Sequence, residues 1–110
     1  MADSDRIVAV ASGFGVWEGG RPGPAVPWRD VTTVTAYRRA VDGATAVHLR
    51  VTLADGRAIV MHDRMAGWST FLQAAPERLP KMPAPSSWWP AAAHPELGER
   101  ELVLFERGRR

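Results

Sequence analysis

The sequence predicts an α+β domain, in which a strongly bent antiparallel β-sheet of about five to seven strands is packed by one α-helix. Three observations favour this class. Residues 31–38 are rich in β-branched and aromatic side chains, and residues 46–62 alternate between apolar and polar around a turn at Asp55-Gly56. After residue 63 the apolar residues follow a helical period. Short turns join the strands, so neighbouring strands are expected to pair antiparallel.

The N-terminal part predicts two short strands, over residues 6–11 and 16–17, with a turn or bulge at residues 13–15. The glycine- and proline-rich residues 19–27 are expected to form a loop without regular structure. The 110 residues are long enough to bury one core, so residues 1–110 are predicted to form a single domain. At its ends we expect disorder, in residues 1–5 and 108–110.

The central hairpin has two possible registers. A two-residue loop would pair Val51 with Val60. A three-residue loop with Gly56 in a left-handed bulge pairs Val51 with Ile59 instead. The second register brings apolar residues together on one face of the hairpin, and we therefore expect it.

The helix is predicted to span residues 64–75, with Asp63 as its N-cap and Pro76 closing it. Residues 76–90 contain five of the nine prolines and are predicted to form an extended strap rather than a domain linker. Residues 101–106 are apolar at neighbouring positions. This pattern predicts a last strand that is paired inside the sheet rather than at its edge.

Composition excludes several classes of protein. The chain has no cysteine, which excludes disulfides, thiolate metal sites and a cysteine nucleophile and fits a cytoplasmic location. No stretch approaches the length of about 20 apolar residues that a membrane span needs. Thirteen of the fourteen basic residues are arginine, but the net charge is only +2. We attribute the arginines to codon bias and expect no nucleic-acid partner.

Three patterns resemble catalytic or metal sites, and each is incomplete. The Gly-x-Gly at residues 13–15 follows a strand, but Glu18 stands where a dinucleotide-binding loop needs its third glycine. No serine lies in a Gly-x-Ser-x-Gly elbow. In the expected register His48 and His62 lie close together on the solvent-side face beside Asp63, but without a helical His-x-x-x-His motif surface histidines are the preferred interpretation. We therefore expect no enzyme activity, no cofactor and no metal site.

Trp88 and Trp89 are the first candidates for a binding site. In an extended chain successive side chains point to opposite faces, so one of the two indoles is expected to be exposed. Exposed tryptophan is often the centre of a protein–protein contact. The two residues are therefore candidates for contact with a protein partner, or with a second copy of the chain in a homodimer. Packing under the strap is nevertheless the preferred interpretation of the pair.

Arginines in and around the hairpin are the second candidates. If they gather near one end of the sheet, their guanidinium groups suit a phosphate headgroup or an acidic peptide. The preferred interpretation is that they only solubilise an exposed sheet. The candidate anion-binding residues are Arg38, Arg50, Arg57 and Arg64.

Several motifs can be compared with known proteins: Trp28-x-Asp30-Val31-x-x-Val34-x-Ala36-Tyr37-Arg38, Asp55-Gly56, Gly67-Trp68, Trp88-Trp89-Pro90 and Leu104-Phe105-Glu106-Arg107. In these motifs the chain resembles a group of small uncharacterised bacterial proteins, a resemblance that implies no activity. The first motif is also similar to strands of bacterial pleckstrin-homology-like domains, which implies a partial barrel packed by one helix. In that family the helix ends the chain, whereas here it is predicted to precede the last strand.

The expected function is a non-catalytic module that binds a protein partner or associates with itself. Binding of an anionic ligand by the arginines is the alternative.

Overall fold

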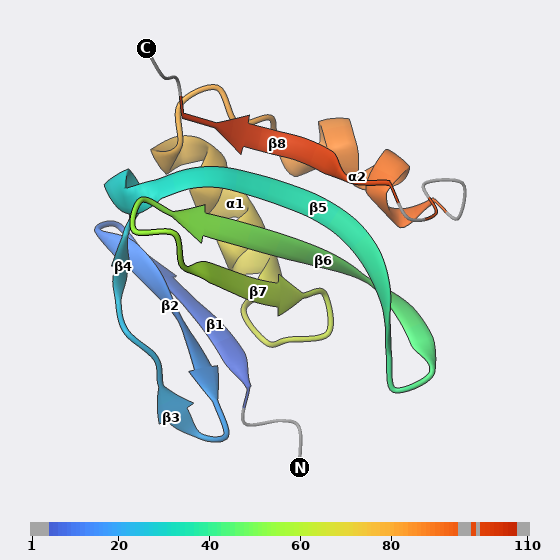
Figure 1. Cartoon of the computed structure of the whole chain (residues 1–110), viewed down its shortest axis with the longest axis horizontal. Helices are drawn as coiled ribbons and strands as arrows, with labels where there is room; N and C mark the ends of the chain where they lie inside the picture. Colours follow the sequence, from blue (N-terminus) through green and yellow to red (C-terminus); the bar gives the residue numbers. More distant parts are fainter. Residues whose placement is uncertain (1–4, 95–97, 99, 108–110) are drawn as a thin grey trace.

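The computed structural model describes residues 5–94, 98 and 100–107. It has two four-stranded antiparallel sheets and two helices around one core (Figure 1). The predicted α+β class is therefore confirmed. The disorder expected of residues 1–4 and 108–110 concerns positions outside the described residues. The carboxylate of Asp5 accepts a hydrogen bond from the backbone N–H of Gly19 at 2.9 Å.

The N-terminal sheet consists of short strands, and β2 pairs with each of the other three. Its first two strands confirm the prediction, but the turn expected at residues 13–15 is instead the start of β2. A Cβ on Gly13 would collide with the carbonyl group of Val26, so glycine at this position allows β4 to approach β2. The loop expected over residues 19–27 holds two short strands. The bounds are β1 Arg6–Val10, β2 Gly13–Glu18, β3 Arg21–Pro22 and β4 Val26–Pro27.

The main sheet has the order β7-β6-β5-β8, and all its pairs are antiparallel. A 3-10 turn at Trp28–Asp30 separates it from the N-terminal sheet, so the strands form two sheets rather than one. The buried Trp28 fixes this turn, because its indole N–H donates to the carbonyl oxygen of Val10 at 3.0 Å. The strands are β5 Val31–Val41, β6 Ala44–Leu53, β7 Ala58–His62 and β8 Leu102–Glu106.

The hairpin of β6 and β7 has the expected bulged register. Val51 lies opposite Ile59, and Leu49 lies opposite Met61. Gly56 has a φ of 92°, and its N–H donates to the carbonyl oxygen of Leu53 at 2.9 Å. The sequence pattern therefore predicted the register correctly.

Helix α1 spans Trp68–Arg78, later than the predicted residues 64–75. Asp63 is not its N-cap. The carboxylate of Asp63 instead accepts a hydrogen bond from the backbone N–H of Val47 at 3.3 Å, and Gly67 precedes the helix with a φ of 87°. Pro76 lies inside the last turn rather than ending the helix. Because proline has no N–H, one hydrogen bond of the helix is missing at this position.

The extended strap predicted over residues 76–90 is wrong, because these residues contain the end of α1 and most of a second helix, α2 Pro85–Ala93. Pro85 is the first residue of α2, where the missing N–H of proline would have no helical partner in any case. In Figure 1, α1 lies behind the main sheet. The two helices and both sheets contribute side chains to one apolar core.

Strand β8 is an edge strand, contrary to the prediction that it lies inside the sheet. Its partner is β5, and Leu104 and Phe105 are buried on the core side. Val103 is 62% exposed, so the apolar residues at neighbouring positions do not indicate burial on both faces.

Candidate functional site

A groove of about 580 Å³ lies between α1 and α2. Its walls follow from the helical period, which places residues one turn apart on the same side of a helix. Helix α1 contributes Trp68 and Leu72, which are four positions apart. Helix α2 contributes Pro85, Trp89 and Pro90. Most of the surface of the groove is therefore aromatic or aliphatic.

The two candidate tryptophans have different roles. Trp88 is 5% exposed and belongs to the core, whereas Trp89 is partly exposed and lines the groove. Trp89 packs edge-to-face between the rings of Trp68 and Trp88, with centroid distances of 6.2 and 5.9 Å. The sequence predicts that one of the pair is exposed, whereas Trp89 is only partly exposed and both residues lie in a helix rather than in extended chain.

Two indole N–H groups are buried without a hydrogen-bond partner, those of Trp68 and Trp88. Trp28, by contrast, donates its indole N–H to a carbonyl oxygen. A buried donor without an acceptor costs about 1–3 kcal/mol. Trp68 also lines the groove, but its indole nitrogen has almost no accessible surface, so this donor is not open to the groove.

Polar groups are few in the groove. They are the hydroxyl groups of Ser69 and Ser86 and the carboxylate of Asp63. Within the described part of the chain, Asp63 forms no salt bridge, and its hydrogen bond is the one from the N–H of Val47. The groove therefore combines apolar walls with one negative charge.

The four candidate arginines do not converge. Arg57 lies at the turn between β6 and β7, where it pairs with Asp55 at 2.7 Å. Arg64 lies at the opposite end of the sheet and donates to the carbonyl oxygen of Val41 at 3.0 Å. Arg50, in the middle of β6, pairs with Glu101 at 2.8 Å.

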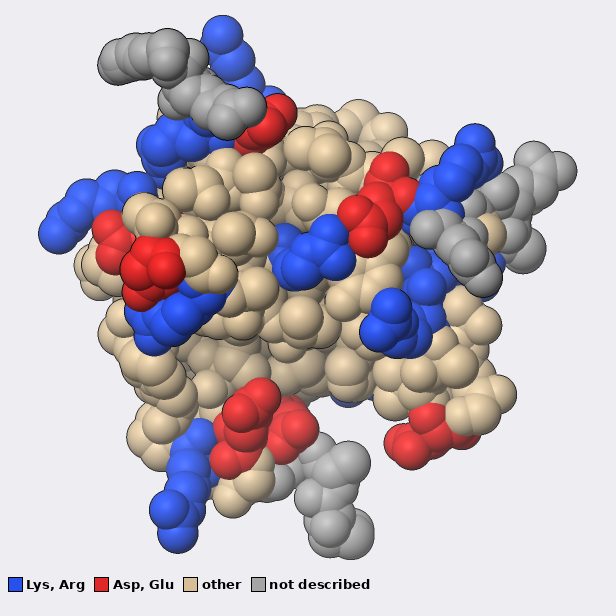
Figure 2. Space-filling model, viewed as in Figure 1, with Lys and Arg blue, Asp and Glu red and all other residues tan. Residues whose placement is uncertain are grey.

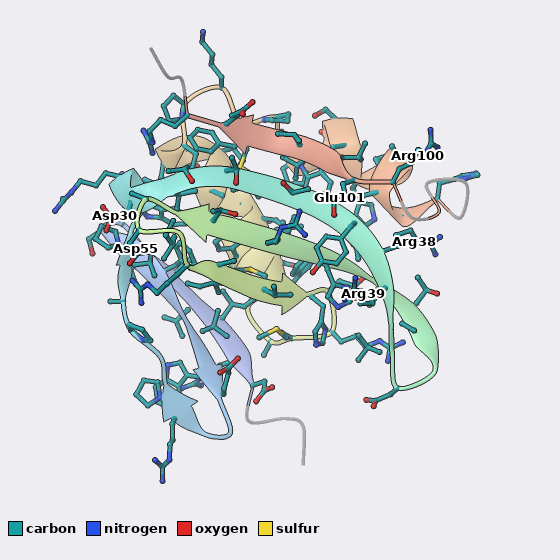
Figure 3. The ribbon with its side chains drawn as sticks, viewed as in Figure 1. Asp30, Arg38, Arg39, Asp55, Arg100 and Glu101 are labelled. Carbon is teal, nitrogen blue, oxygen red and sulfur yellow. The ribbon has the colours of Figure 1, made fainter. Side chains whose placement is uncertain are left out.

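Arg38 also lies away from the turn that holds Arg57. Arg38 donates to the carbonyl oxygen of His94 at 3.3 Å. Figure 3 places Arg38, Arg39 and Arg100 at one end of the main sheet, and Asp55 at the other. On the face shown in Figure 2, basic and acidic side chains are interspersed rather than gathered by sign. The geometry of a single anion site built from all four predicted arginines is therefore not present.

The outer face of the main sheet carries a row of rings across three strands. His48 stacks on Tyr37, with ring centroids 5.2 Å apart, and His62 follows at 5.4 Å. Arg39 and Arg50 lie over the ring of Tyr37 at 5.5 and 5.3 Å. The hairpin register predicted the histidine pair, whereas the stacking on Tyr37 depends on the pairing of β5 with β6 and was not predicted.

His48 is not a surface histidine, since it is 5% exposed. Burial lowers its pKa, and the nearby His62 and Arg39 act in the same direction, against a raising effect of the Ala46 carbonyl and Asp63. The described residues contain no cluster of three or more side chains suited to hold a metal ion.

The sequence did not indicate Pro85 and Ser86 as residues of a groove, because the prolines around them predict an extended segment. The signal that could have placed them was Pro85 itself, a residue typical of the first position of a helix. Trp68 was assigned to the core from its period. It is buried, and as the first residue of α1 it also reaches the groove.

No helix in the described ranges has the length and apolar character to cross a membrane. No protein-family model, curated protein or solved structure matches the chain. The resemblance to pleckstrin-homology-like domains therefore stays a prediction, and function has to be argued from the groove itself.

Proposed function

We propose that this chain is a non-catalytic binding module that takes a short segment of a partner protein into the groove between α1 and α2. The observation that carries the proposal is Trp89, a large side chain that lines an apolar groove and stays partly exposed. Tryptophan is enriched among the residues that dominate binding energy at protein interfaces.

The dimensions of the groove support this proposal. Its volume of about 580 Å³ lies in the range of about 300–1,000 Å³ that is usual for ligand sites. Both walls are helices that belong to the main core, so the groove exists before any ligand binds. A preformed site loses less entropy on binding than one that must be ordered.

The dispersed arginines do not favour the alternative of an anionic ligand, because each of the four has its own partner and they do not converge on one place. A protein partner in the cytoplasm, rather than a nucleic acid, agrees with the small net charge of +2.

The test is a selection from a random peptide library displayed on phage, followed by calorimetric titration of the enriched peptides. We expect peptides that bind the unmodified protein and lose about tenfold or more in affinity to Trp89→Ala. Val103→Ser is the matched control, since Val103 is an exposed apolar residue on β8, outside the groove. It should bind with unchanged affinity, and circular dichroism should show that both variants are folded.

Light scattering covers the case of a homodimer. A dimer that dissociates in Trp89→Ala but persists in Val103→Ser would mean that the groove takes a segment of a second copy. The proposal is wrong if the library yields no peptide above background and the protein stays monomeric at high concentration. It is also wrong if every enriched peptide binds Trp89→Ala as tightly as the unmodified protein.

A further inference from the structure

We propose that the free edge of β7 is a second docking surface, which takes a short extended segment of a partner protein as an added β-strand. This surface is separate from the groove between α1 and α2, and the inference does not rest on the function proposed for that groove. Two observations carry it. The outward backbone groups of Ala58 and Val60 have no partner within the part of the chain that the structure describes, and a cleft lies along the strand beside them.

The unpaired groups follow from the hydrogen bonds between β6 and β7. At one end of β7, the N–H of Leu53 donates to the carbonyl oxygen of Arg57 at 2.8 Å. At the other end, the N–H of Asp63 donates to the carbonyl oxygen of Val47 at 3.0 Å. Every second residue of an antiparallel strand bonds to a given neighbour. The odd-numbered residues of β7 therefore bond to β6, and the backbone groups of the even-numbered residues point away from it.

Three residues of β7 point their backbone groups away in this manner. His62 uses both groups locally, because its N–H donates to the sulfur of Met65 at 3.4 Å and its carbonyl oxygen accepts from the N–H of Met65 at 3.1 Å. Among the described strands only β6 pairs with β7, so the N–H and C=O groups of Ala58 and Val60 are left without a protein partner there. Both residues are exposed, and Val60 keeps 46% of its surface accessible.

A cleft of about 510 Å³ lies along this edge of β7. Ala58, Ile59 and Val60 line one side of it, and Val16 and Pro24 are apolar residues of the other side. In Figure 1 this edge of β7 faces the N-terminal sheet. A segment in the cleft can therefore hydrogen-bond to β7 on one side and pack apolar side chains against Val16 and Pro24 on the other.

The free backbone groups identify the class of occupant. Every second residue of a strand presents a partially positive N–H and a partially negative C=O, at a repeat of about 7 Å. An extended backbone carries complementary charges at the same repeat, whereas the backbone groups of a helix are used within the helix. A second copy of the chain does not fit by its own β7, because that strand carries β6 on the side where the N-terminal sheet closes this cleft.

The other sheet edges are less suited to strand addition. Strand β1 is already bonded at its edge, where the N–H of Ile7 donates to the carbonyl oxygen of Ala66. Strand β8 has an irregular register against Val34 and Thr35, and β3 and β4 are two residues long. Bulges and very short edge strands are features that prevent pairing with another chain. Strand β7 pairs with β6 without a register shift, so its free edge stays regular.

The experiment measures amide hydrogen exchange by NMR at single residues of the full chain. In the free protein the amides of Ala58 and Val60 should exchange fast, and those of Ile59 and Met61 slowly, because only the second pair bonds to β6. The probe is a capped peptide of about seven residues, in which valine and threonine alternate between terminal lysines. Bound peptide should slow exchange at Ala58 and Val60 about tenfold or more and leave the amide of Val103 in β8 unchanged.

Backbone methylation of the probe separates strand addition from apolar contact. One version carries N-methyl groups on the valines and another carries them on the threonines, and both keep the side chains of the parent peptide. Only every second amide of an added strand points at β7. One version should therefore bind about tenfold more weakly, and the other should bind as the parent peptide does. If both versions bind alike, the backbone of the peptide is not what the edge recognises, and the inference is overturned.

Val60→Pro removes the free donor without removing a hydrogen bond between β6 and β7, because proline is tolerated on an edge strand where the N–H faces outward. This variant should bind the parent peptide about tenfold more weakly. Val60→Thr is the matched control, since it keeps the N–H and the β-branched shape, and it should bind with unchanged affinity. Circular dichroism shows whether both variants are folded. The methylated peptides test the same hydrogen bonds on the unmodified protein if the proline variant does not fold.

Three further results would overturn the inference. Slow exchange at Ala58 and Val60 in the dilute free protein would mean that the edge is already closed. Protection that grows with protein concentration in the absence of peptide would make a second copy, not a partner, the occupant. No slowing at millimolar peptide would mean that the edge adds no strand. Trp89→Ala should bind the peptide as the unmodified protein does, so the outcome is independent of the groove between α1 and α2.

Discussion

Replacing Gly67 by alanine should destabilise the protein much more than the same change at another glycine of similar conformation. Gly67 has a φ of 87°, and a Cβ there would collide with the backbone carbonyl of Ile7. The same strand is held by a hydrogen bond from the N–H of Ile7 to the carbonyl oxygen of Ala66, at 2.8 Å. The alanine methyl group therefore has to push β1 away from the start of α1.

The expected loss of unfolding free energy in Gly67→Ala follows from a comparison with Gly56→Ala. Gly56 has a φ of 92°, but a Cβ on it would meet nothing within 4 Å. Gly56→Ala therefore measures the left-handed backbone alone, about 1–2 kcal/mol. Gly67→Ala adds the loss of the bond to Ile7 and a donor left without its partner, about 1–3 kcal/mol. We expect it to lower the free energy of unfolding by about 3–4 kcal/mol in total.

Urea denaturation followed by circular dichroism measures both variants under the same conditions. The expected result is an excess of about 2 kcal/mol for Gly67→Ala over Gly56→Ala. If the two variants lose the same stability, the close approach of β1 to Gly67 does not exist in solution, and the reasoning is refuted.

Three further predictions concern single side chains. The pKa of His48 is lowered in the folded protein, so at a pH near and below about 6.5 the unfolded chain binds more protons than the folded chain does. The free energy of unfolding should therefore decrease as the pH falls through this range. The urea midpoint should therefore drop more between pH 7 and pH 5 in the unmodified protein than in His48→Gln; equal slopes would contradict this. Trp28→Phe keeps a ring in the core but loses the hydrogen bond to Val10, and should cost about 1–2 kcal/mol in the same assay; no loss would mean that the bond adds no stability. Arg50→Gln breaks a salt bridge to Glu101 in which both side chains are well exposed, and should change stability by less than about 1 kcal/mol, with Glu101→Gln as the matched control. A larger change in either would show that the pair is more than a surface contact.

The parts of the fold that the sequence predicted are those decided by local pattern. The register of the hairpin followed from apolar pairing across a single turn, because a shift by one residue would have moved every buried side chain to the solvent face. The helical period after residue 63 predicted α1, but its start depended on the approach of β1 to Gly67. That contact joins residues far apart in the sequence, so local signals placed the helix too early.

Local sequence pattern does not predict the groove, because the groove lies between two helices and the pattern predicts only one of them. The five prolines of residues 76–90 indicated extended chain, yet Pro85 and Pro90 are both accommodated in α2. Trp89 stays a candidate contact, although the strand-like alternation that indicated it does not apply in a helix. The arginines became candidates on the expectation that they gather near one end of the sheet, but the strand pairing places them at different positions along it.

The bond between Ile7 and Ala66 joins the N-terminal sheet to the segment that leads into Trp68, a wall of the groove. If a ligand bound in the groove holds Trp68 in place, it also opposes local opening of this junction, and occupancy of the groove and pairing of β1 are then thermodynamically linked. Amide hydrogen exchange at Ile7 would then slow when the groove is filled, although Ile7 does not line it. Conversely, an affinity tag or fusion partner that strains β1 would then weaken ligand binding from a distance. Binding to the groove is therefore best measured without sequence added before β1.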